Sequence, residues 1–403
     1  MTADAGAASR SRVLRQALAL SLGAAVSLGL ARFSYALLLG PMRADLGWSY
    51  FTAGAMNTGN AAGYLLGALA MPRLMARVGP KPALVGGGLA TALLLALHGL
   101  VTDNGALMAL RLAAGAASAA TFVAGGLLAA RLGGQAVAAA AGSGLGAGLV
   151  LGLYYGGTGL GIIVSAFLVP AFDRAGAAHG WQPAWQALGA VALGMTALMA
   201  LGTARDAPVA GTAATPAPVP WRALGWALAG YAMFGLGYIG YMTFIVTLLR
   251  EQQLGSGAIT AFYVTLGLGV VASSWLWAGL LQRWRGGQVL ALLNGLLALA
   301  TVLPVLSAHP VAVFGSGALF GAVFLSVVAS TTALVRHNLP VAAWPRGIAA
   351  FTIIFALGQI AGPSLVGRIA DGPGGLARGL ALSAAMLALG ALLALAQRPL
   401  RTG

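Results

Sequence analysis

The sequence predicts an all-α membrane protein with twelve transmembrane helices, arranged as two halves of six. Three observations support this fold class. Of the 403 residues, 59% are hydrophobic and only 7% are charged, whereas a soluble domain carries about 25% charged residues. Long apolar runs recur along the whole chain, and one polar stretch divides them into two sets of six. A surface with so little charge needs lipid, not water, as its solvent.

Each transmembrane helix needs about 20 mostly apolar residues. The first apolar run follows Arg10 and Arg12 like a secretory signal peptide, but it continues to Leu39. The apolar core of a signal peptide holds only about 7–15 residues, so this run is predicted to be an uncleaved first span. The predicted spans are 14–39, 50–72, 83–101, 105–130, 138–169, 185–203, 223–249, 258–282, 288–307, 311–335, 346–369 and 375–397.

The longest polar break contains several prolines among small residues, between Arg205 and Pro220. A stretch of Pro, Ala and Thr cannot bury a hydrophobic core, so it is predicted to be a linker. The expected domains are therefore an N-terminal six-helix bundle at 1–204, a cytoplasmic Pro-rich linker at 205–221 and a C-terminal six-helix bundle at 222–403.

The basic residues predict the orientation. With the N-terminus in the cytoplasm, fifteen of the 22 Lys and Arg fall on the cytoplasmic side, five on the outer side and two within spans. The positive-inside rule then predicts that both termini are cytoplasmic. The net charge of +15 reflects a shortage of acids, only 7 in all, and not a basic cluster, so no nucleic-acid partner is predicted. The absence of Cys excludes disulfides, thiolate metal sites and cysteine nucleophiles.

The loop after the second span, Pro72 to Lys81, resembles a pattern of the major facilitator superfamily, Gly-x-x-x-Asp-Arg-x-Gly-Arg-Lys. Arg77, Gly79 and Lys81 match the pattern, while Ala76 replaces the Asp. The resemblance implies a conformational role for this loop, without the carboxylate that latches one conformation in the family. The positive-inside rule alone also explains its basic residues.

Two further patterns resemble this superfamily. Arg111 is followed by Gly115 in the fourth span, and the fifth span resembles the exchanger motif, with Leu153 replacing its Pro. Glycines four residues apart also let helices pack closely, whatever the function. The conformational glycines predicted in the fifth span are Gly148, Gly152, Gly156 and Gly157.

A narrower resemblance is to the YbfB/YjiJ-type branch of the superfamily. It rests on four short segments: 32–35, 63–67, 234–239 and 358–363. The superfamily resemblance implies a secondary transporter whose two halves rock around a central site. The location expected for it is the plasma (inner) membrane of a bacterium, as a multi-pass protein in the lipid bilayer, and we expect a monomer that binds a small-molecule substrate without a cofactor.

Two charged residues lie within predicted spans, Arg32 and Arg111, whereas all seven acids fall in predicted loops or tails. An arginine near the middle of a membrane costs at least about 2.5 kcal/mol, so it normally marks a functional site. From their distance to the span ends, both arginines are expected roughly 10–12 Å below the outer edge. Gly29 and Gly115 are expected to leave room beside them.

The planar guanidinium binds carboxylates bidentately, so a substrate carboxylate would supply the missing counter-charge. The hypothesis is therefore transport of a small organic anion held by these arginines. The alternative is that each arginine binds backbone carbonyls or extends toward the interface. Polar residues at similar depth complete the predicted substrate site: Asn57, Asn60, Tyr238, Tyr241 and Gln359.

Other functions stay open. Efflux of hydrophobic compounds or drugs competes with uptake, although Leu153 in the exchanger motif argues against drug efflux. An integral membrane enzyme would need a nucleophile–base pair or a metal cluster, which the spans lack. The four His are expected at span ends or in loops, so proton coupling would use the substrate itself, Asp45 or Glu251, or would be replaced by exchange or facilitated diffusion. Six tryptophans near span ends are predicted to lie in interfacial belts: Trp48, Trp181, Trp185, Trp221, Trp226 and Trp344.

Overall fold

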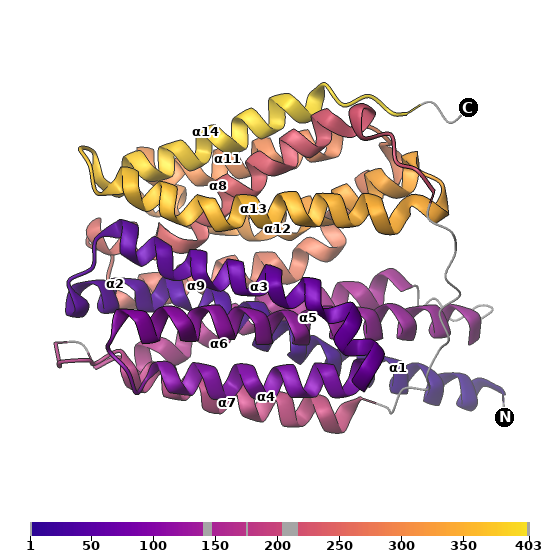
Figure 1. Cartoon of the computed structure of the whole chain (residues 1–403), viewed down its shortest axis with the longest axis horizontal. Helices are drawn as coiled ribbons and strands as arrows, with labels where there is room; N and C mark the ends of the chain where they lie inside the picture. Colours follow the sequence, from indigo (N-terminus) through magenta and orange to yellow (C-terminus); the bar gives the residue numbers. More distant parts are fainter. Residues whose placement is uncertain (1, 140–146, 175, 204–216, 401–403) are drawn as a thin grey trace. The chain divides into compact units, whose positions relative to one another are not determined.

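The computed structural model describes residues 2–139, 147–174, 176–203 and 217–400, with side chains described except at 2–9, 136–139 and 147. Every regular element within these ranges is a helix (Figure 1). An all-helical chain is compatible with lipid, because a helix satisfies its backbone hydrogen bonds internally. The predicted linker 205–221 lies outside the described residues up to residue 216.

The first part of the chain begins with one continuous helical segment that changes its winding at Ala25 and again after Phe33. Among the described residues, five long helices follow it. The elements are α1 (Thr2–Ala24), the π-helix η1 (Ala25–Phe33), α2 (Tyr35–Leu46), α3 (Tyr50–Val78), α4 (Pro80–His98), α5 (Asn104–Ala139), α6 (Ala147–Phe172) and α7 (Gln182–Gly202).

The second part holds the remaining helices. They are η2 (Trp221–Leu224), α8 (Gly225–Glu251), α9 (Ser256–Leu276), α10 (Ala278–Arg283), α11 (Gln288–Leu306), α12 (Pro310–Asn338), η3 (Val341–Ala343), α13 (Trp344–Ala370) and α14 (Gly375–Leu395).

Eleven helical segments among the described residues are long and apolar enough to cross a membrane. They confirm the prediction of a multi-pass, all-α membrane protein. The helix α3 is not one of the eleven, although it is 29 residues long. Asn57, Thr58 and Asn60 lie in its first half and lower its mean hydropathy.

The chain divides into two compact units. Unit 1 comprises Met1–Pro41 and Ala62–Pro208, and unit 2 comprises Met42–Ala61 and Val209–Gly403. The first twelve residues of α3 therefore belong to unit 2 and the rest of this helix to unit 1.

In unit 1, α4 packs against α5 and α7, while α6 packs against α1 and η1 (Figure 1). Two glycine contacts bring α6 close to its partners. A Cβ added at Gly157 would lie 1.9 Å from the backbone oxygen of Ser21, and one added at Gly29 would lie 2.5 Å from the Cα of Gly161. Gly29 was expected to leave room beside Arg32. That expectation is wrong, because the backbone of α6 fills the space.

In unit 2, α8 packs against α13 and α14, and α12 packs against α9 and α11. The middle of α8 is buried without interruption from Gly237 to Leu249. A helix that is buried on every side must present its polar side chains to protein partners, not to lipid or water. This position of α8 accounts for the hydrogen-bonded tyrosines described below.

Candidate functional site

The first candidate residue, Arg32, lies near the end of the π-helix η1. All nine residues of η1 are buried, and the N–H of Ser34 donates to the oxygen of Gly29 at 3.1 Å, five residues back. Turns of this width are rare and often occur at functional sites. They aim the side chains that follow in a direction that a regular α-helix would not give.

The Arg32 side chain is 4% exposed, and its Cζ lies 5.7 Å from the ring centroid of Tyr64 on α3. Its Nε and Nη2 atoms are buried, and neither has a hydrogen-bond partner among the described residues. Buried polar groups are nearly always hydrogen-bonded, and a buried charge without a partner is costly. Arg32 therefore carries an unmet demand for an acceptor.

Arg111 on α5 is 1% exposed but well satisfied. Its Nη1 donates to the backbone oxygen of Ala31 at 3.2 Å. Its Cζ lies 4.5 Å from the ring centroid of Tyr35 and 5.9 Å from that of Trp185. The second predicted arginine is thus bound to the residue that precedes the first, and two aromatic faces stabilise its charge.

His98 extends this cluster and was missed as a site residue. It is the last residue of α4, at a span end as predicted, but it is fully buried and stacks on Trp185 with 4.5 Å between ring centroids. Its Nδ1 lies 2.7 Å from the oxygen of Leu94, and its Nε2 has no hydrogen-bond partner among the described residues. No sequence pattern links α4 to α7 at this point.

The expected interfacial belt is wrong for three tryptophans. Trp48, Trp181 and Trp185 are 5%, 1% and 0% exposed, so none of them reaches a lipid headgroup. Position near a span end did not predict burial, because the neighbouring helix α4 covers both the helix start and the ring of Trp185.

The other five predicted substrate residues lie in unit 2 and are also buried. Asn57 donates to the hydroxyl of Thr243 at 2.7 Å, and Thr243 in turn donates to the oxygen of Ile239 at 2.6 Å. Asn60 lies one turn further along α3 and is completely buried. Both asparagines are therefore in the protein interior.

The two tyrosines of α8 bind different partners. The Tyr238 hydroxyl donates to Oε1 of Gln359 on α13 at 2.7 Å. The Tyr241 hydroxyl lies 2.6 Å from the hydroxyl of Ser316 on α12, which donates to the oxygen of Ala300. Tyr238 and Gln359 form one hydrogen-bonded pair, and Tyr241 belongs to a separate pair with Ser316.

Aromatic rings surround Tyr238. Its ring stacks on Phe234, Phe355 and Phe324, with centroid distances of 4.8, 5.4 and 6.1 Å. Tyr231 continues the stack, 5.4 Å from Phe234. We call these five residues the aromatic cluster. From the sequence, Tyr238 was predicted to contact substrate, and Phe234 entered only as part of a family resemblance.

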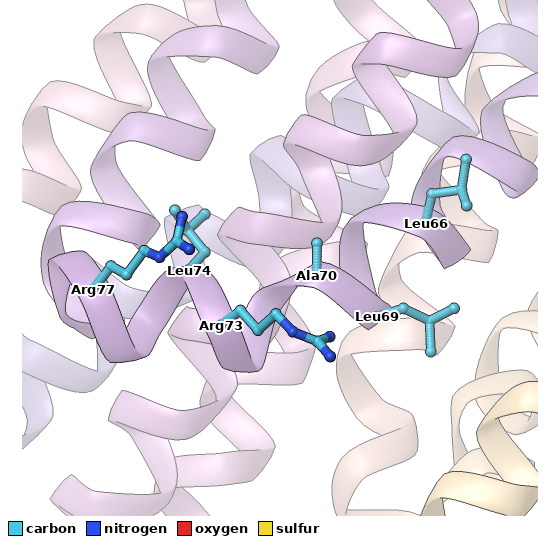
Figure 2. Close-up of a pocket in the computed structure, with 6 residues that line it drawn as sticks. All are labelled: Leu66, Leu69, Ala70, Arg73, Leu74 and Arg77. Atoms are coloured by element: carbon cyan, nitrogen blue, oxygen red, sulfur yellow. The ribbon is translucent and has the colours of Figure 1, made fainter.

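The predicted loop 72–81 is mostly helical: Arg77 lies in the last turn of α3, Gly79 lies between the two helices and Lys81 lies in the first turn of α4. Gly79 precedes α4 with a φ of +85°, which favours glycine, and the ammonium group of Lys81 donates to the backbone oxygen of Thr203 at the end of α7. Arg77 lies in an open groove on α3 with Arg73 and four apolar side chains (Figure 2). The groove contains no predicted substrate residue. Its lining is Leu66, Leu69, Ala70, Arg73, Leu74 and Arg77.

The predicted glycines of α5 and α6 differ in their surroundings. Gly115, Gly152, Gly156 and Gly157 are buried, whereas Gly148 is exposed and a Cβ there would meet nothing within 4 Å. Gly157 has a packing role, because its missing side chain admits the backbone of α1.

A second polar cluster holds the first turn of α3 within unit 2. The N–H groups of Tyr50 and Phe51 donate to the two carboxylate oxygens of Asp371 at 2.7 and 2.9 Å, and the Tyr50 hydroxyl donates to Glu251. The Cζ of Arg43 lies 3.8 Å from the Tyr50 ring centroid. Asp371 thus caps α3 from the end of α13, a role that its place in a predicted loop did not reveal.

Comparison with known proteins decides the family. Residues 24–395 match the family MFS_4, described as "Uncharacterised MFS-type transporter YbfB". The chain belongs to this family. The resemblance to the YbfB-type branch is therefore confirmed, and the chain is a membrane transporter of solutes and not an enzyme.

Solved structures of similar fold are also transporters. A bacterial homolog of the human lysosomal transporter Spinster, in an inward-facing and unoccupied conformation, is 14% identical, with a TM-score of 0.65 over 96% of this chain and 95% of that one. The nucleoside transporter NupG is 14% identical, with a TM-score of 0.68 over 96% and 98%. A point mutant of NupG is 16% identical, with a TM-score of 0.70 over 94% and 99%. No curated protein matched the sequence.

The YbfB-type match includes every residue predicted to contact substrate, from Arg32 to Gln359. At 14–16% identity, the structural likeness to Spinster and NupG concerns the fold alone. The substrate of this YbfB-type transporter must therefore be argued from its own side chains.

Proposed function

We propose that this YbfB-type protein is a secondary active transporter that moves a small organic anion across the bacterial inner membrane by alternating access. One observation carries the proposal: Arg32 is buried within an apolar helix, with two nitrogen atoms that lack a partner among the described residues. A charge is retained in such a place for a function. A ligand of opposite charge is the simplest group that would satisfy it.

The topology that goes with this proposal has twelve spans, with α3 as the twelfth. Its 29 residues are long enough to cross a bilayer, and its asparagines are buried in protein, away from lipid. Two six-helix bundles, 1–204 and 222–403, are then joined by the linker 205–221, and both termini are cytoplasmic.

Export of a hydrophobic compound is the second candidate. The aromatic cluster around Tyr238 favours it, because stacked rings bind apolar and aromatic molecules well. A nucleoside is a suitable control solute, because the nucleoside transporter NupG has a similar fold.

Uptake into proteoliposomes tests the proposal. We would compare labelled carboxylates, nucleosides and amphiphilic cations with the wild-type protein, Arg32→Ala and Arg222→Ala. Arg222 is exposed and serves as the matched control. We expect carboxylate uptake that Arg32→Ala abolishes and Arg222→Ala preserves. Carboxylate uptake that Arg32→Ala leaves unchanged would disprove the role of Arg32, and transport of the cations alone would favour export.

A further inference from the structure

The two buried arginines of unit 1 differ in what their nitrogen atoms contact. Arg111 donates to Ala31 and lies against two aromatic faces. Arg32 lies near one aromatic ring, that of Tyr64, and its Nε and Nη2 have no hydrogen-bond partner among the described residues. The ring face attracts the cation but accepts none of the hydrogen bonds that the edge of the guanidinium can donate.

The identity of the two unsatisfied atoms is informative. In a guanidinium group, Nε and Nη2 lie on the same edge, so their N–H bonds point in parallel. A carboxylate accepts two parallel hydrogen bonds on its two oxygens, in the fork geometry that makes arginine the preferred partner of planar oxyanions. A single carbonyl or hydroxyl oxygen would leave one of the two donors unmet.

We propose that the Nε–Nη2 edge of Arg32 is the binding site for a carboxylate group of the transported solute, and that Arg111 is a positioning residue. Arg111 acts through its hydrogen bond to Ala31, which fixes the backbone one residue before Arg32. This inference rests on the proposed function, and it narrows an anionic solute to a carboxylate bound side-on.

The surroundings of Arg32 fit this role. Both unsatisfied atoms are shielded from solvent, so the bound carboxylate is desolvated and its hydrogen bonds gain strength. The ring centroids of Tyr64 and Phe122 are 6.4 Å apart, so aromatic side chains continue from the guanidinium into unit 1. A solute reaches the buried edge through another conformation of the protein, as alternating access requires.

The first experiment needs no ligand. Arg32→Met replaces the buried cation with an apolar side chain of similar length, so we expect the purified protein to unfold at a higher temperature than the wild type. Arg111→Met is the matched comparison, and it should unfold at a lower temperature because it loses a bound partner. Lower stability of Arg32→Met would mean that the guanidinium is satisfied structurally, and it would overturn the inference.

The second experiment measures binding by thermal shift with aliphatic and aromatic mono- and dicarboxylates, each paired with its amide. We expect at least one carboxylate to stabilise the wild type where its amide does not. Arg32→Lys keeps the charge but loses the two parallel N–H donors. The variant should therefore need at least a tenfold higher carboxylate concentration for the same stabilisation. Arg111→Lys should raise the KM of uptake and leave the maximal rate largely intact, whereas a purely structural defect would lower the maximal rate.

The outcomes separate this inference from the proposed function. Stabilisation by no carboxylate, or equal stabilisation of wild type and Arg32→Lys, overturns the side-on carboxylate site. Uptake of an anion without a carboxylate group that still depends on Arg32 would support the proposed function. It would show that the inferred carboxylate site is wrong. Uptake of neutral or cationic solutes alone, independent of Arg32, would remove both.

Discussion

The guanidinium group of Arg111 donates a hydrogen bond to the backbone oxygen of Ala31, the residue beside Arg32. The contact joins α5 to the π-helix η1. Through it, the buried cation Arg111 helps to fix the position of the buried cation Arg32. Two buried cations therefore lie on neighbouring segments of unit 1, and the proposed anion site depends on this arrangement.

Removal of the α6–α1 contact should destabilise unit 1. Gly157→Ala places a Cβ on the backbone oxygen of Ser21, so the helices must separate, at a cost of roughly 1–3 kcal/mol. Gly148→Ala is the control on the same helix, since nothing lies within 4 Å of its added Cβ. Thermal unfolding in detergent should show a lower midpoint for the first variant only. Equal midpoints would mean that the helices are not in this close contact.

The cap on α3 gives a second prediction. Asp371→Ala removes the acceptor for the N–H groups of Tyr50 and Phe51, which should cost about 1–2 kcal/mol. Amide hydrogen exchange should then increase in the first turn of α3 but not in α14. Glu251→Gln is a useful comparison, because it leaves both backbone bonds in place and should not expose these amides. Unchanged exchange in Asp371→Ala would contradict the capping role.

Tyr238 provides a test of the second candidate function, the export of a hydrophobic compound. Tyr238→Phe keeps the stack with Phe234 and Phe355 but loses the hydrogen bond to Gln359. If the aromatic cluster binds hydrophobic compounds, this variant should protect cells from them as well as the wild type, while Tyr238→Ala should not. Drug sensitivity of a deletion strain carrying each variant measures this. Full protection by Tyr238→Ala would exclude the cluster as an export site.

The glycine before α4 provides a third stability test. Gly79 has a φ of +85° and a ψ of 164°, a backbone conformation open almost only to glycine, so an L-residue there costs on the order of 1–3 kcal/mol. Gly79→Ala should therefore lower the unfolding midpoint, and Lys81→Met should do so through loss of the bond to Thr203. Gly86→Ala, on the same helix with no atom within 4 Å of its added Cβ, is the control. A Gly79→Ala midpoint equal to that of the wild type would contradict the strain argument.

The sequence predicted what depends on composition and missed what depends on pairing. Apolar runs of sufficient length indicated the helices, because a chain in lipid must satisfy its backbone hydrogen bonds within helices. Charge within such a run singled out Arg32 and Arg111, because a charged side chain inside a membrane is costly. The sequence did not indicate which residues of different helices contact each other. The contacts of Gly29 with Gly161 and of His98 with Trp185 each join two helices, and only the packed bundle specifies them.

The π-helix was also beyond prediction. Residues 25–33 continue the apolar run that begins in the second half of α1, so no local preference marks the change of winding. It appears where the backbone of η1 meets α6 at Gly29 and binds Arg111 at Ala31. Tertiary contacts, which the sequence does not display, accompany the change.

The polarity of α3 has a consequence for anyone who counts spans by hydropathy. Eleven crossings are an odd number, and they would put the two termini on opposite sides of the membrane. The twelve crossings that we propose would put both termini on the cytoplasmic side. Whether α3 crosses the membrane therefore determines on which side a reporter fused after Gly403 would be found. With the proposed twelve crossings, fluorescent protein fused there should glow, and alkaline phosphatase fused there should stay inactive.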